Sequence, residues 1–86
     1  NMFKAANSYT ASYTNVAGLQ VSAPVTLNGF KVGQVRDIRY EYENPGHVRV
    51  EMSLDKELRV PQGSKAVIEA DILGTAQVAL HGVNTV

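Results

Sequence analysis

The side chains that could perform chemistry lie scattered along this chain. The two histidines, His47 and His81, are far apart, and neither belongs to an HxH or HExxH spacing. Protein zinc sites combine several histidine, cysteine or carboxylate ligands at characteristic spacings, and this chain has no cysteine. We therefore expect no metal centre and no cofactor, with both histidines as surface residues.

The carboxylates and hydroxyls show no catalytic arrangement either. Asp37, Glu41, Glu51 and Glu69 fall on the polar faces of expected strands, where such residues usually serve as solvating charge. No serine lies in the G-x-S-x-G context of a nucleophile elbow. The glycines of NGFKVGQV are not followed by a helix that could bind phosphate at its N-terminus. We therefore expect a protein that is not an enzyme.

The charge of the chain argues against a nucleic-acid surface. Eight basic and eight acidic residues cancel, and they are interleaved along the chain, whereas nucleic-acid binding needs a clustered basic face. One alternative of this class stays open, a small oligonucleotide-binding barrel. It would use Tyr40 and Tyr42 as stacking platforms beside Arg36 and Arg39.

The segments that must position all these residues have the period of β-strands. In HVRVEMSL, Val48, Val50, Met52 and Leu54 alternate with polar residues, which indicates a strand with one buried and one solvated face. SYTASY, PVTLN, KAVIEA and AQVALH show the same alternation. No segment sustains the 3.6-residue period of a helix, so we expect negligible helix.

The segment VGQVRDIRYEY is a long strand whose alternation breaks once. Ile38, Tyr40 and Tyr42 share one face, but Val35 precedes Ile38 by three residues rather than two or four. A β-bulge at Arg36 or the next residue would direct both Val35 and Ile38 into the core. The bend that such a bulge produces favours a sheet that closes into a barrel.

Turn signals separate these strands at regular intervals. Asn28-Gly29 suits a tight hairpin because both residue types tolerate positive φ, and ENPG (43–46) marks a second turn. Gly18 and Gly33 are expected at turn, bulge or close-packing positions. The pattern predicts an all-β fold, a small single-domain β-barrel of six or seven short strands spanning residues 1–86. Its expected core is Val25, Leu27, Val35, Ile38, Val48, Val50, Met52, Leu54, Ile68, Val78 and Leu80.

The segment DILGTAQ (71–77) departs from the usual composition of a connection. Ile72 and Leu73 are large and aliphatic, whereas loop tips are usually polar. Two interpretations are open: the pair folds back into the core of its own barrel, or it is exposed and contacts something apolar.

The order of these features resembles the MCE (mammalian cell entry) domain of the MlaD-like lipid-transport family. The similarity covers about residues 9–82, nearly the whole chain. Single motifs of this kind are weak, but five in order at matching spacing are specific. They are Gly18-Leu19, Ala23-Pro24-Val25, the NG…VGQV run (28–35), the VP.GS run (60–64) and ILGTAQVAL (72–80).

The resemblance implies a homo-hexameric ring that moves phospholipids or other lipids between the inner and outer membranes of bacteria. The apolar pore loop of the family corresponds here to Asp71–Thr75, with Ile72 and Leu73 lining the pore and Asp71, Gly74 and Thr75 supporting the loop. Such rings act in the periplasm, in some cases on the permease and ATPase of an ABC transporter. No apolar run here is long enough to cross a bilayer, so the implied membrane anchor is an N-terminal helix outside this chain.

Overall fold

Six β-strands pair into one sheet in the computed structural model, which describes residues 6–82. The strand order across the sheet is β1-β4-β3-β2-β6-β5. All neighbours are antiparallel except β2 and β6, which run parallel. The strands are β1 (Ala6–Tyr13), β2 (Pro24–Leu27), β3 (Phe30–Tyr40), β4 (Val48–Asp55), β5 (Lys65–Ala70) and β6 (Ala76–His81).

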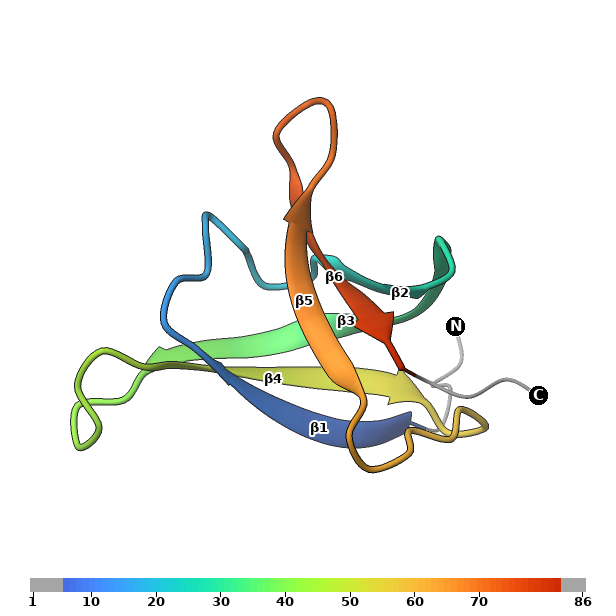
Figure 1. Ribbon diagram of the computed structural model, residues 1–86, viewed down its shortest axis with the longest axis horizontal. Helices are drawn as coiled ribbons and strands as arrows, with labels where there is room; N and C mark the ends of the chain where they lie inside the picture. The colour runs from blue at the N-terminus through green and yellow to red at the C-terminus, as the bar shows by residue number, and fades with distance from the viewer. Residues whose placement is uncertain (1–5, 83–86) are drawn as a thin grey trace.

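The sheet curls into a half-barrel (Figure 1). The pairing of β3 with β4 shifts register between Val35 and Asp37, which confirms the predicted bulge, and bulges of this kind bend and twist a sheet. The curl brings together β1 and β5, the two ends of the strand order. There the Tyr13 hydroxyl donates a hydrogen bond to the Ala66 carbonyl oxygen at 2.7 Å. The predicted all-β fold with six or seven short strands is therefore confirmed.

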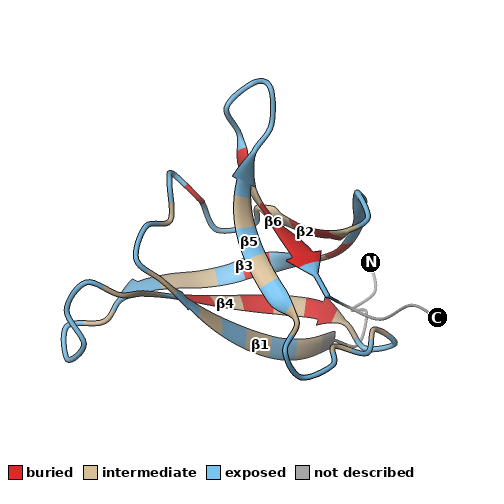
Figure 2. Ribbon diagram, in the orientation of Figure 1, coloured by how far each residue is buried: buried red, intermediate tan, exposed pale blue. Residues whose placement is uncertain are grey.

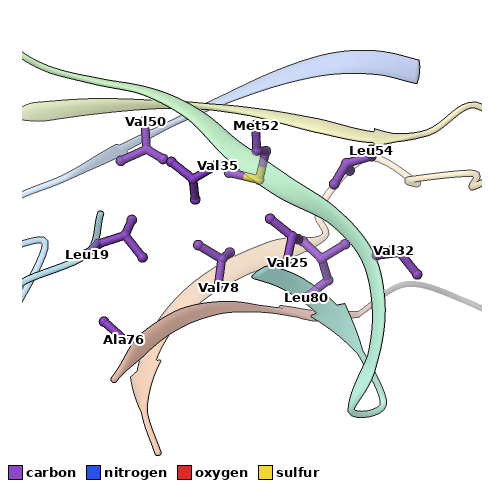
Figure 3. Packing of buried hydrophobic residues seen from close by; sticks show 10 residues of the cluster. All are labelled: Leu19, Val25, Val32, Val35, Val50, Met52, Leu54, Ala76, Val78 and Leu80. Atoms are coloured by element: carbon purple, nitrogen blue, oxygen red, sulfur yellow. The ribbon is translucent and has the colours of Figure 1, made fainter. Parts of the chain in front are cut away.

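The hydrophobic core lies inside this curl, and its buried residues come from four of the six strands and one loop (Figures 2 and 3). Seven residues of the predicted core are buried, and Leu27, Ile38 and Ile68 are partly buried and pack against the core cluster. Leu19 and Val32 are buried as well, although the alternation did not single them out. The buried predicted residues are Val25, Val35, Val50, Met52, Leu54, Val78 and Leu80.

The structure corrects the predicted core at one end of the sheet. Val48, the first residue of β4, is only partly buried and lies outside the core cluster. Tyr40, the last residue of β3, and Tyr42, which follows the strand, do not continue the buried face of Ile38. Both tyrosines are exposed, and their rings pack edge to face with centroids 5.1 Å apart. The alternation of apolar and polar residues in the sequence continues to Tyr42, whereas β3 ends at Tyr40.

The glycines expected to shape the chain occupy special positions. Asn28 and Gly29, between β2 and β3, have φ of 54° and 81°, as a tight hairpin with two left-handed residues requires. Gly18 lies in the turn before β2 with φ of 81°. Gly33 differs, because a Cβ there would overlap the backbone of Ser53 and Leu54 on β4. Its role is close packing between two strands.

Candidate functional site

The hairpin that connects β5 and β6 projects away from the rest of the sheet (Figure 1). Its tip carries Ile72 and Leu73, whose side chains are 100% and 86% exposed. The interpretation that this pair folds back into the core of its own barrel is therefore wrong. Ile72 and Leu73 are the two most exposed large hydrophobic residues of the part of the chain that the structure describes.

Asp71 organises the backbone of this tip. Its Oδ1 atom accepts hydrogen bonds from the amides of Leu73 and Thr75, both at 2.9 Å. Such local bonds from an aspartate side chain are typical of Asx turns. They hold the backbone on both sides of Leu73, so the tip is a defined turn rather than an open loop.

The backbone of the hairpin closes the same turn. The amide of Gly74 donates to the Asp71 carbonyl oxygen, and the amide of Asp71 donates to the Thr75 carbonyl oxygen, both at 2.9 Å. Gly74 has φ of 86°, the left-handed conformation that a three-residue hairpin loop needs at its last position. The five residues from Asp71 to Thr75 thus form one unit, in which three residues fix the shape and two present side chains.

A groove of about 560 Å³ lies beside this hairpin. Gly18 and the segment 20–24 form one wall, and residues 73–76 of the hairpin form the other. Val21 and Leu73 are both exposed and both line the groove. Sequence reasoning missed Val21, and the available signal was an aliphatic residue between the polar residues Gln20 and Ser22 in the connection before β2.

The two histidines contact exposed polar side chains outside the Asp71–Thr75 tip. His81 is 3.4 Å from Glu69, and the Ser12 hydroxyl is 3.4 Å from the His47 ring, in each case among exposed side chains. Within residues 6–82, no group of three or more histidine, cysteine, aspartate or glutamate side chains could hold a metal ion. The same range contains no helix long and apolar enough to span a membrane. The exposed side chains of Ile72 and Leu73 offer apolar contact at the tip.

The model of the family described as MlaD protein matches residues 5–82. The chain belongs to the MlaD family. This family is associated with lipid transport, an activity that needs apolar contact surfaces. No curated protein matches the chain.

The MlaD-like site predicted from the sequence falls on one hairpin. Asp71 to Thr75 lie together at its tip, and Gly18 lines the groove beside it. Asn28 and Gly29 form the β2–β3 hairpin, and Gly33 lies between β3 and β4, so these three residues shape the fold rather than the tip.

Proposed function

We propose that this chain is a subunit of a ring in which the β5–β6 hairpins line a central pore for lipid. The observation that carries this proposal is the exposure of Ile72 and Leu73 on a hairpin tip that Asp71 and Gly74 hold in one shape. Membership of a lipid-transport family supports the same function.

The energetics of the tip favour contact with acyl chains. An aliphatic side chain of this size gains roughly 1.5–3 kcal/mol on full burial relative to water. Ile72 and Leu73 gain nothing of the kind in the isolated chain, because both are exposed. An apolar annulus built from several copies would remove them from water whenever an acyl chain passes. Such contact is non-directional and needs no catalytic group.

The assembly that fits this role is a homo-hexamer in the periplasm that carries phospholipids between the inner and outer membranes. An anchoring helix outside this chain and the permease and ATPase of an ABC transporter are the partners that we propose for it. The basis is the resemblance of the five sequence motifs to MlaD-like rings.

The alternative of an oligonucleotide-binding barrel has weaker support. Tyr40 and Tyr42 pack against each other edge to face, which leaves less ring surface for stacked bases. The guanidinium group of Arg39 forms an ion pair with Asp37, with Nε and Oδ2 2.7 Å apart. Tyr40, Tyr42 and Arg39 are thus each engaged by a neighbour in the chain.

The test replaces the apolar tip without touching the core. The double variant Ile72→Asn/Leu73→Asn should unfold at nearly the wild-type temperature, because neither side chain is buried. It should still lose lipid transport, because amide side chains would force an acyl chain to leave apolar contact at the narrowest point. Tyr42→Asn is the matched control, since Tyr42 is 85% exposed but lies on a different loop. Wild-type transport by a folded double variant would contradict the proposal.

A further inference from the structure

One large apolar side chain remains unexplained by the fold and by the hairpin tip. Phe30, the first residue of β3, is 73% exposed. It pairs in register with Leu27 at the C-terminal end of β2, so it stands beside the tight Asn28-Gly29 turn. A phenylalanine in water at this position leaves a large apolar area uncovered.

The groove beside the β5–β6 hairpin and Phe30 lie at opposite ends of β2. Pro24, the first residue of β2, lines it, whereas Leu27, the last residue of β2, pairs with Phe30. Figure 1 shows the β2–β3 turn and the segment before β2 on opposite sides of the β5–β6 hairpin. Phe30 therefore cannot reach the groove of its own chain.

The lining of this groove suits an uncharged side chain. None of its residues carries a charge. Val21, Ala23, Pro24 and Leu73 supply apolar surface, and Gln20, Ser22 and Thr75 supply polar surface. Its volume is about 560 Å³, and it is partly open to solvent. One aromatic ring fits within that space, whereas a lysine or arginine side chain would find no counter-charge there.

We infer that Phe30 of one copy inserts into the groove of a second copy of this chain. The other large apolar side chains exposed on residues 6–82 are already accounted for or are less exposed than Phe30. Ile72 and Leu73 form the tip, Tyr40 and Tyr42 pack on each other, Val21 lines the groove itself, and Val67 is the least exposed of the group.

This contact joins two different surfaces, and such heterologous contacts repeat from copy to copy until a ring closes or a filament grows. Each copy carries the β2–β3 turn, which Phe30 follows, on one side of the β5–β6 hairpin and the segment before β2, which lines the groove, on the other. Successive copies would therefore set their hairpins side by side. Because Leu73 lines the groove, the inserted ring of the neighbour would also lie against one side of the tip. The inference rests on the proposed ring and identifies how its subunits touch.

The chain offers a clean test because it contains no cysteine. We would prepare Lys31→Cys, which leaves the Phe30 ring in place because Lys31 is the next, exposed residue of β3, and Val21→Cys as separate chains. The two chains would be mixed and oxidised under non-denaturing conditions. Disulfides form only when the two Cα atoms approach within about 7 Å. The expected main product is the mixed disulfide dimer. Each variant alone should give little dimer, because a heterologous contact brings no two copies of the same position together.

A matched control separates specific contact from random collision. Tyr42→Cys mixed with Val21→Cys places an equally accessible thiol on a loop outside the inferred contact, and this mixture should give only trace dimer. Circular dichroism and thermal unfolding of each variant would verify the fold before oxidation. Comparable dimer yields from the control mixture and the test mixture would overturn the inference.

Light scattering distinguishes failure of the contact from failure of the ring. If the wild-type chain assembles but the Lys31→Cys/Val21→Cys mixture yields no mixed dimer, the subunits meet through another surface. That result would overturn the inference and leave the proposed ring standing. A wild-type chain that is monomeric at all concentrations tested would overturn the inference together with the ring. Lipid capture at the hairpin tip remains a separate readout of the proposed function in either case.

Discussion

At the scale of single residues, Asp71 is the side chain on which the shape of the hairpin tip depends. Replacement by alanine removes the acceptor of the Leu73 and Thr75 amides. We expect Asp71→Ala to lower the free energy of unfolding by about 1 kcal/mol, near the net value of one hydrogen bond, because the exposed amides can bind water instead. Thermal unfolding and hydrogen exchange of the two amides would measure the effect.

Asp71→Asn is the control for this prediction, because asparagine keeps an Oδ1 acceptor. The asparagine variant should protect the Leu73 and Thr75 amides much as the wild type does. Equal loss of protection in both variants would show that the side-chain bonds do not hold the tip.

The sequence revealed part of this site at the residue scale. Ile72 and Leu73 stood out because aliphatic residues are unusual in a connection between short strands, and Gly74 marked a turn. Val21 did not stand out, because its place beside Leu73 depends on how the segment before β2 folds over the sheet. Such proximity between distant segments leaves no periodic signal in one sequence.

At the scale of elements, the packing of β3 on β4 depends on the absence of a side chain at Gly33. A Cβ there would overlap the Ser53 carbonyl oxygen and the Leu54 backbone. We expect Gly33→Ala to destabilise the protein by about 1–3 kcal/mol or more, the usual cost of overpacking. Gln34→Ala is the control, since Gln34 is the next residue of β3 and is exposed. Urea denaturation would compare them, and equal midpoints would contradict the assigned close approach.

The sequence predicted the strands better than their pairing. The alternation in β4 and the broken phase around Arg36 located a strand and a bulge, because both are local consequences of which side chains are buried. The parallel pairing of β2 with β6 is not local, since it joins residues such as Val25 and Val78 from opposite halves of the chain. Val32 also escaped prediction, because a second register shift, between Val25 and Thr26, changes the alignment of β3 with β2.

At the scale of the whole molecule, Tyr13 joins the two ends of the strand order. Its hydroxyl donates to the Ala66 carbonyl oxygen, and burial raises the pKa of Tyr13 above its ordinary value of 10.0. The folded state thus favours the neutral phenol. The resulting stability is fully present below about pH 10 and is lost as the pH rises through the folded-state pKa.

The variant Tyr13→Phe isolates this contribution. It should be less stable than the wild type by about 1 kcal/mol at neutral pH, because it lacks the hydrogen bond. The difference should shrink above about pH 10, where only the wild type loses stability through ionisation of this phenol. Denaturation midpoints of both proteins between neutral and alkaline pH would show it. A constant difference across that range would contradict the role assigned to Tyr13.

The central claim, that the β5–β6 hairpin touches lipid, is tested most directly by a photo-crosslinking amino acid at position 73 in cells that make the protein. The same amino acid at position 42 is the control, because Leu73 and Tyr42 are 86% and 85% exposed. We predict that position 73 captures phospholipid and that position 42 captures little. Equal capture at the two positions, or no lipid at position 73 in a folded protein, would contradict the account.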